Sequence, residues 1–544
     1  MTFDISGCFP YPVPRPEQVK AIEFALDAFY NQDKRFVIID AGTGIGKSGV
    51  GLAIARYMEK HPIGQVSQAE TVAFGTWFLT TQKILQDQYV RDFGPPNGDM
   101  LSIKSATNYQ CKHKNCSCAE SRQLLKTEPE GTPFHRACKT GGCVYVHARE
   151  AWLHSRESVT NFPYFMTFGN YANGVKTRRL LVIDEAHNVE SELSKFIDVS
   201  VSEIFAQRVL RMRMPEIRTQ HQGVKWIREI YFPKVSSHLA HVKVMMAKFK
   251  GLRDKIKQMR TLSRQLELLE GHFKKMQIFL ATYDKENWVM NVLRSDGKKG
   301  RRLEFKVIDV APFSEENLFR FGDRVLLMSA TILNSEAFCE GLGIPKDQVA
   351  VIEIPSPFPV ENRPILYSPV GRMSRSSIDQ TLPKMVETVK MLLEHHKDEK
   401  GIIHTHTYRI ANYLRDKLQD PRILIHDSAN REHTLQQHHD SERATVLLSP
   451  SMTEGIDLKG DDGRFQIICK IPYPYLGDPL IKKRMNRWKW WYALQTAKSI
   501  VQSSGRSVRS MEDHAVTYIL DEDWRMFFGR NKAMFPATFK DALM

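Results

Sequence analysis

The feature that most constrains this chain is a stretch near its N-terminus, RFVIIDAGTGIGKSGVGLAIARYM at residues 35–58. Residues 36–39 form a short apolar run, which is typical of a buried strand in a parallel sheet. A glycine-rich turn follows, and the apolar residues after it are compatible with a helix. A strand, a glycine turn and a helix in this order let backbone N–H groups close around phosphate oxygens. The stretch therefore predicts an α/β domain that binds a nucleotide through its phosphates.

The glycine turn also carries the side chains that nucleotide chemistry needs. We expect Lys47 to reach the β- and γ-phosphates and the Ser48 hydroxyl to bind Mg²⁺. Ala41 departs from the general phosphate-loop pattern, because it stands where that pattern has its first glycine. The residues predicted to bind the nucleotide in this turn are Gly42, Thr43, Gly44, Gly46, Lys47 and Ser48.

A second stretch, RRLLVIDEAHNVE at residues 178–190, supplies the acidic groups of a nucleotide hydrolase. Its apolar run predicts a buried strand, and two carboxylates follow at the carboxyl end, where ligands bind in open α/β sheets. We expect Asp184 to hold Mg²⁺ and Glu185 to orient and deprotonate the attacking water. His187 is a candidate for coupling the nucleotide state to motion.

The α/β pattern returns in the last third of the chain. Apolar runs precede polar or glycine-rich residues at 401–408, 444–460 and 465–475, which predicts a second parallel-sheet domain. The stretch QSSGRSVRSMED, residues 502–513, places Arg506 and Arg509 three positions apart on one helical face. In a two-domain ATPase, such arginines stabilise charge on the γ-phosphate bound by the other domain.

Taken in order, these motifs resemble the XPD/DinG-like iron–sulfur branch of superfamily 2 helicases. The matching stretches are RPEQ (15–18), AGTGIGKS (41–48), FLTTQKILQDQY (78–89), DEAH (184–187), SAT (329–331), SPFPVENRPI (356–365), TEGIDLKG (453–460) and QSSGRSVRSMED (502–513). The resemblance implies that Gln18 reads adenine and that Asp457 and Gln502 line the nucleotide site. It also implies that Arg506 and Arg509 act as arginine fingers.

The resemblance implies an ATP-hydrolysing DNA helicase that moves 5′-to-3′ on single-stranded DNA and opens forked duplexes. One alternative is a DEAH-type RNA helicase, against which the cysteine-rich insert and the SPFPVENR stretch argue. A second alternative is a nucleic-acid-binding scaffold that uses ATP as a switch. Intact Lys47, Glu185 and Arg506 argue against that scaffold. DNA repair is one of several pathways that the sequence leaves open.

Five of the eight cysteines lie within residues 111–143. In a reducing compartment, clustered cysteines are more often metal ligands than disulfides. By the residues alone, four thiolates fit a tetrahedral zinc ion as well as an iron–sulfur cluster. The resemblance implies a [4Fe–4S] cluster in an insert that faces the DNA. The implied ligands are Cys111, Cys118, Cys138 and Cys143, with Cys116 as the alternative to Cys118.

A long helical segment follows the DEAH stretch. Apolar residues recur every three or four positions from Val242 to Leu280, which predicts an amphipathic helical hairpin. The resemblance identifies this segment as an arch that helps to frame a passage for single-stranded DNA. Two later stretches, 288–293 and 301–313, predict strands that return to the first motor domain.

The predicted fold class is α/β, with two RecA-like parallel-sheet motor domains and with an iron–sulfur insert and a helical arch insert in the first. The predicted boundaries are 1–100, 151–195 and 301–350 for the first motor domain, 101–150 for the iron–sulfur insert, 196–300 for the arch and 351–544 for the second motor domain.

The net charge of +15 favours a polyanionic partner, and the expected partners are single-stranded and forked DNA. Basic residues of the cysteine insert suit contact with phosphates. They are Lys104, Lys112, Lys114, Arg122, Lys126, Arg136 and Lys139. No apolar run approaches the length of a membrane span and no secretory signal pattern is present, so we expect a cytoplasmic protein. The resemblance suggests a monomer.

Overall fold

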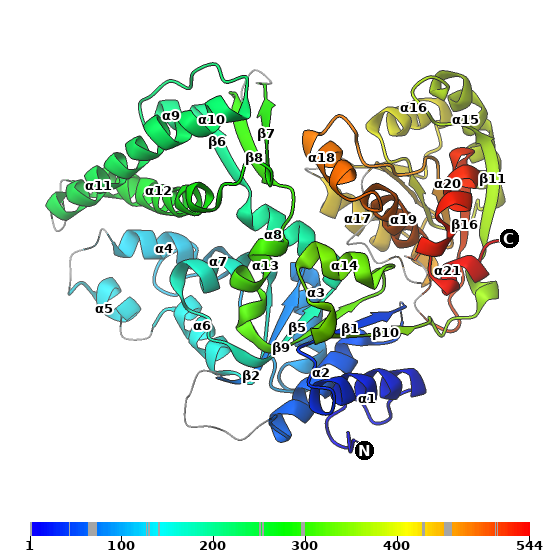
Figure 1. Ribbon diagram of the computed structural model, residues 1–544, viewed down its shortest axis with the longest axis horizontal. Coiled ribbons are helices and arrows are strands. Elements are labelled where there is room, and N and C mark those ends of the chain that lie inside the picture. Colours follow the sequence, from blue (N-terminus) through cyan, green and yellow to red (C-terminus); the bar gives the residue numbers. More distant parts are fainter. Residues whose placement is uncertain are drawn as a thin grey trace.

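In the computed structural model, two parallel sheets with surrounding helices form the body of the molecule, and a helical arm extends from the first (Figure 1). The structure describes residues 3–42, 44–63, 73–126, 128, 131–139, 142–249, 252, 255–294, 300–426, 430–450, 458, 460–505, 508 and 510–544.

The first sheet has seven strands in the order β10-β1-β9-β5-β2-β4-β3, and every neighbouring pair is parallel. Its strands are β1 (Phe36–Ala41), β2 (Ala73–Thr80), β3 (Leu101–Ser102), β4 (Glu157–Asn161), β5 (Arg178–Asp184), β9 (Gly322–Ser329) and β10 (Val349–Ile354). Such strands are covered on both faces, which explains their continuous apolar runs.

Helices cover both faces of this sheet and form two separate apolar cores. One core contains residues of α1 (Pro16–Tyr30), α2 (Lys47–Lys60) and α3 (Lys83–Phe93). The other contains residues of α6 (Val144–His154), α7 (Phe162–Ala172), α8 (Val189–Ile197), α13 (Ala311–Asn317) and α14 (Ser335–Leu342).

The second sheet has six parallel strands in the order β11-β16-β15-β12-β14-β13. They are β11 (Ile365–Gly371), β12 (Gly401–His404), β13 (Ile423–Ile425), β14 (Val446–Ser449), β15 (Phe465–Ile468) and β16 (Val516–Asp521). The helices of this domain are α15 (Ile378–His395), α16 (Tyr408–Leu418), α17 (Arg431–Asp440), α18 (Pro479–Arg487), α19 (Trp491–Ser504), α20 (Asp523–Asn531) and α21 (Ala537–Asp541). Two parallel α/β sheets confirm the predicted fold class.

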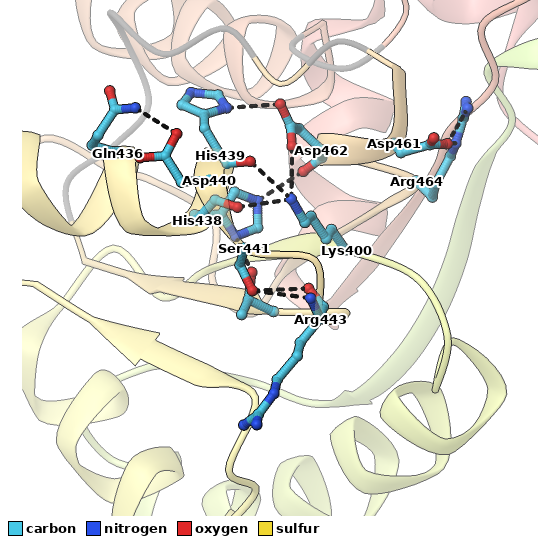
Figure 2. A network of polar contacts seen from close by, with 11 residues as sticks. Lys400, Gln436, His438, His439, Asp440, Ser441, Arg443, Asp461, Asp462 and Arg464 are labelled. Atoms are coloured by element: carbon cyan, nitrogen blue, oxygen red, sulfur yellow. Dashed lines mark hydrogen bonds and ion pairs between the residues drawn. The ribbon is translucent and has the colours of Figure 1, made fainter.

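A polar network attaches α17 to the second sheet (Figure 2). Lys400, directly before β12, donates from Nζ to the carbonyl of His438 at 2.8 Å and to Oδ1 of Asp462 at 3.0 Å. The ring of His439 lies 2.7 Å from Oδ2 of the same Asp462. This helix has little apolar surface of its own, so hydrogen bonds and charge hold much of its contact with the domain.

The cysteine-rich segment contains the short helices α4 (Cys118–Leu125) and α5 (Pro133–Lys139). The arm above it contains α9 (Glu203–Arg208), α10 (Gln220–Trp226), a π-helical turn (Ile227–Tyr231), α11 (Phe232–Phe249) and α12 (Ile256–Thr282) (Figure 1). The pair α11 and α12 is the helical hairpin that the apolar spacing predicts. No helix within the described ranges is long and apolar enough to cross a membrane.

The base of the arm is a three-stranded antiparallel sheet in the order β6-β8-β7. Its strands are β6 (Val199–Ser202), β7 (Trp288–Leu293) and β8 (Arg302–Val307). The strands expected after the arch therefore exist, but they do not enter the first motor sheet. They pair with β6 instead, and β8 alternates buried and part-exposed residues as a strand covered on one face does.

Candidate nucleotide site and domain interface

The phosphate loop joins β1 to α2. Gly46 precedes α2 with a φ of 79°, and Gly44 has a φ of 82°, a region that glycine adopts readily. The Lys47 ammonium lies over the loop and donates to the carbonyl of Ala41 at 3.1 Å. The loop thus presents the first turn of a 14-residue helix, whose N-terminal N–H groups favour an anion.

Gln18 of α1 and Arg15, which directly precedes this helix, hold the phosphate loop by hydrogen bonds. Gln18 is buried and donates from Nε2 to the carbonyl of Ile45 at 2.8 Å. The Arg15 guanidinium donates to the carbonyls of Gly44 and Ile45 at 2.7 and 2.9 Å. A methyl group added to Gly46 would lie 2.7 Å from Nε2 of Gln18. These contacts place Gln18, which is predicted to read the adenine, against the phosphate loop. They also show that Arg15, which is not among the residues predicted for this site, contacts the same loop.

The two predicted carboxylates follow β5. Asp184 is buried, with 7% of its surface exposed, whereas the side chain of Glu185 is 36% exposed. Burial raises the pKa of Asp184, the Glu185 carboxylate adds to this rise, and the Lys47 ammonium opposes it. The buried carboxylate thus lies within electrostatic reach of the phosphate-loop lysine, while the more exposed one is accessible to water.

Tyr89 of α3 joins the two groups that are predicted to hold Mg²⁺. Its hydroxyl donates to Oδ2 of Asp184 at 2.9 Å. The Ser48 hydroxyl is also hydrogen-bonded with the Tyr89 hydroxyl, and this bond lowers the pKa of Tyr89. The Ser48 hydroxyl is therefore the donor and the phenol oxygen is the acceptor. Burial and the charge of Asp184 outweigh this effect and raise the pKa of Tyr89. The stretch FLTTQKILQDQY contains Tyr89, but nothing in its spacing predicts this role.

His187 connects this site to the second motor domain. Its Nδ1 lies 2.8 Å from Oγ of Ser329 and 3.3 Å from Oε2 of Glu185. From α19, the buried Gln502 amide lies 2.8 Å from Nε2 of His187, and the Lys498 ammonium donates to the His187 carbonyl at 2.5 Å. Amide donation to Nε2 places the ring proton on Nδ1. His187 therefore lies between a nucleotide-site carboxylate and the second motor domain.

A second contact between the motor domains lies at α18. The buried Arg484 forms an ion pair of 2.7 Å with Glu190 and donates to the carbonyl of Ile308 at 2.9 Å. Arg487 forms an ion pair of 2.7 Å with Asp309. The second motor domain is thus held to α8 and to the base of the arm.

Four of the residues predicted for this site lie outside the described residues. They are Thr43, Asp457, Arg506 and Arg509. The structure brings together the other nucleotide-site residues, namely Gln18, Gly42, Gly44, Gly46, Lys47, Ser48, Asp184, Glu185 and Gln502.

Two family profiles match the chain. The family described as Helicase C-terminal domain matches residues 389–542, and the family described as Type III restriction enzyme, res subunit, matches residues 12–214. The ATP-dependent DNA helicase DinG of Photobacterium profundum is 25% identical over 242 residues, which cover 40% of this chain and 34% of the relative. The ATP-dependent DNA helicase YoaA of Escherichia coli (strain K12) is 24% identical over 195 residues, which cover 34% of this chain and 30% of the relative. The chain thus spans about a third of the length of these curated relatives.

Solved structures of the same group share the fold. A structure described as XPD helicase has a TM-score of 0.63 at 14% identity, covering 96% of this chain and 99% of that chain. Xpd4 of S. tokodaii has a TM-score of 0.57 at 15% identity, covering 97% of this chain and 100% of that chain. The chain is similar to the XPD/DinG-like helicases of superfamily 2.

In this XPD/DinG-like chain, four thiols of the cysteine insert influence one another. Burial raises the pKa of Cys118, and the Cys143 thiol, which is hydrogen-bonded to it, adds to this rise together with Cys111. Burial also raises the pKa of Cys138, and Cys111, Cys143 and Cys118 add to that rise. The chain positions Cys118 by a hydrogen bond of 2.7 Å from its N–H to the carbonyl of Tyr109.

Cys116 adjoins Cys111, whose N–H donates to the Cys116 carbonyl at 3.0 Å. Burial raises the pKa of Cys116, and Cys111 is the cysteine that adds to this rise. Among the described side chains, no set of three or more His, Cys, Asp or Glu is arranged to hold a metal ion. Cys111, Cys118, Cys138 and Cys143 are thus linked by electrostatic influence and by the Cys118–Cys143 hydrogen bond, without forming such a set. Thiolates are the usual ligands of an iron–sulfur cluster, so the residue types fit that group.

Several basic residues of the insert have partners within the protein. Lys104 forms an ion pair with Asp87, and Lys114 lies 3.9 Å from a carboxylate oxygen of Glu128. The Arg122 guanidinium lies 5.5 Å from the centre of the Tyr145 ring. Lys112 and Lys126 are exposed, whereas the Lys139 side chain lies outside the described part.

Proposed function

We propose that this protein is an ATP-driven motor that moves 5′-to-3′ along single-stranded DNA and separates duplex strands at a fork. The observation that carries the proposal is the position of His187 between Glu185 and Gln502. A nucleotide-site residue that touches the second motor domain can convert hydrolysis into movement between the domains. The relatives named as ATP-dependent DNA helicases support DNA as the substrate.

The proposed roles rest on the geometry of the described residues for the first motor domain and on the motif resemblance for Asp457, Arg506 and Arg509. Lys47 neutralises charge on the β- and γ-phosphates, and Ser48 and Asp184 hold the Mg²⁺ that accompanies ATP. Glu185 accepts a proton from the attacking water. Arg506 and Arg509 of the second motor domain stabilise the charge that develops on the γ-phosphate. Gln18 reads the adenine, while Asp457 and Gln502 complete the nucleotide site from the second domain.

ATP hydrolysis in the presence of matched single-stranded DNA and RNA tests the substrate. We expect DNA to stimulate hydrolysis more strongly, and stronger stimulation by RNA would favour an RNA helicase. Strand separation of duplexes with a 5′ tail or a 3′ tail then tests the direction, and we expect only the 5′-tailed duplex to open. Binding of both nucleic acids without separation of either duplex would favour an ATP-switched scaffold.

We also propose that Cys111, Cys118, Cys138 and Cys143 hold a [4Fe–4S] cluster, with Cys116 outside the ligand set. The insert contains short helices and few apolar residues, so a cluster would supply cohesion that its own core lacks. The mutual influence of the four thiols supports this set.

Metal analysis of anaerobically purified protein tests the cluster. We expect about four irons per chain with matching sulfide. The Cys118→Ser variant should lose this iron, whereas the matched Cys116→Ser variant should keep it. One zinc per chain and no iron would contradict the cluster. Loss of iron in Cys116→Ser but not in Cys118→Ser would show that Cys116 is the ligand in place of Cys118.

We propose that the active form is a monomer on DNA. Light scattering of the protein with a short single-stranded oligonucleotide measures the mass of the complex. A mass of one chain plus one oligonucleotide is expected, and a mass of two chains would contradict this proposal.

A further inference from the structure

The segment that leaves β10 packs directly on the phosphate loop. The N–H of Gly42 donates to the carbonyl of Ile354 at 3.1 Å. A methyl group added to Gly42 would lie 2.8 Å from Cβ of Ser356, and one added to Gly44 would lie 1.9 Å from Cζ of Phe358. Neither position has room for a side chain. The two glycines are therefore needed for this close approach as well as for phosphate binding.

The Phe358 ring also contacts the second motor domain. Only 4% of Phe358 is exposed, and its buried apolar neighbours are Val508 and Ala515. The same segment continues to Asn362, whose amide donates to the carbonyl of Met511 at 2.9 Å and whose carbonyl accepts from the N–H of Ala515 at 2.9 Å. The segment is thus bound to the chain around residue 510 at several points.

One aromatic ring therefore lies between Gly44 of the first motor domain and Val508 of the second. In the sequence, Val508 stands between the two proposed arginine fingers, whose placement lies outside the described residues. Among the described residues, the apolar cluster around Phe358 contains three buried residues, of which Phe358 is the largest. In a close-packed contact of this kind, a shift of one neighbour displaces the other.

We propose that Phe358 is a positioning residue that couples the phosphate loop to the arginine-bearing segment around Val508. When the loop closes on a triphosphate, the ring transmits the displacement of Gly44 to Val508. A phenyl ring neither donates nor accepts a proton, so its effect on hydrolysis comes through position alone. This inference rests on the proposed ATPase function and adds the route by which loop closure reaches the second motor domain.

Kinetics of the variants Phe358→Ala and Phe358→Leu test the coupling. Phe321 is a matched control because it is 3% exposed and precedes β9 at the amino end of the sheet, away from the phosphate loop. The measurements are the Kd for a fluorescent ATP analogue, the KM and kcat of DNA-stimulated hydrolysis, and the Tm of each variant.

We expect Phe358→Ala to bind the analogue with nearly the wild-type Kd and to lose about tenfold in kcat, a fraction of what an arginine finger contributes. Phe358→Leu should recover most of this loss because it restores apolar volume. Phe321→Ala should lower the Tm without lowering the kcat of the folded protein.

Two results would overturn the coupling. One is an unchanged kcat in Phe358→Ala. The other is an equal loss of analogue binding and of kcat, because the ring would then only support the phosphate loop. If the wild-type protein itself does not hydrolyse ATP with DNA present, the proposed function fails, and this failure is distinct from both results.

Discussion

The two parallel sheets share one architecture but carry different residues at the carboxyl ends of their strands. In the first sheet, β1 leads into the glycine loop and a helix N-terminus, and β5 ends at the buried Asp184. In the second sheet, the strand β12 ends at His404 and β14 ends at Ser449, whose hydroxyl lies 2.9 Å from the ring of His426. The fold places polar groups at one edge in both domains, but among the described residues the loop shaped for phosphate lies in the first domain.

This difference assigns distinct tasks to the two domains. Residues of the first domain should govern both binding and hydrolysis of ATP. Residues of the second domain, which reach the site through Gln502 and Lys498, should govern hydrolysis and movement more than binding. Variants in each domain can break or confirm this division.

The largest effect is expected from Lys47→Ala. The variant removes the cation that is proposed to neutralise the phosphates, and kcat/KM for ATP should fall about 10³-fold. Lys60→Ala is the matched control, because Lys60 is an exposed residue at the other end of the same helix. An ATPase assay with saturating single-stranded DNA measures both variants. A Lys47→Ala activity above a tenth of the wild-type value would contradict the assignment.

A smaller effect is expected from Glu185→Gln. The amide cannot take a proton from water, so kcat should fall about 10²-fold while ATP remains bound. Equilibrium binding of the fluorescent analogue and single-turnover hydrolysis measure the two quantities separately. Glu316→Gln, an exposed change on α13, should alter neither. If hydrolysis survives in Glu185→Gln, another group acts as the base.

Gln502→Ala tests the second domain. It removes the amide beside the ring of His187, and we expect kcat to fall about tenfold with a much smaller change in the Kd for ATP. Gln436→Ala on α17 is the control, because its amide donates to Asp440 of the same helix at 2.7 Å. A loss of ATP binding in Gln502→Ala would remove the proposed division between the domains.

The smallest effect concerns stability rather than rate. His438 is fully buried in the network of Figure 2, its Nε2 donates to the carbonyl of Asp462 at 2.8 Å, and burial lowers the pKa of the ring. A lowered folded-state pKa means that the stability from the neutral ring is present above the unfolded pKa of about 6.5 and is lost as the pH falls below it. The Tm should therefore fall between pH 7 and pH 5.5.

The variant His438→Gln sharpens this test because glutamine does not titrate. Its Tm should be lower at pH 7 but should change less between pH 7 and pH 5.5 than the wild-type Tm. An identical pH dependence in both proteins would show that His438 does not contribute to it.

Local patterns in the sequence predicted much of the fold. The strand–turn–helix around Lys47, the strand before Asp184 and the hairpin of α11 and α12 each follow from the spacing of apolar residues within one segment. The spacing predicts β7 and β8 as strands but not their pairing with β6 in a separate antiparallel sheet, because the pairing partner of a strand depends on which distant strand lies beside it.

The contacts that complete the site were less accessible to sequence reasoning. Tyr89 meets Asp184 across 95 positions of the chain, and Phe358 meets Gly44 across a still longer separation. No periodicity reports such contacts, because they depend on how whole elements pack. The phosphate loop itself was predictable, since its residues act together within one short segment.

The most direct test of the central claim is strand separation of a fluorescently labelled forked DNA with a 5′ tail. We expect the wild-type protein to separate the strands with ATP, and we expect no separation with a non-hydrolysable ATP analogue or with the Lys47→Ala variant. ATP hydrolysis without separation of any forked or tailed DNA would contradict a helicase.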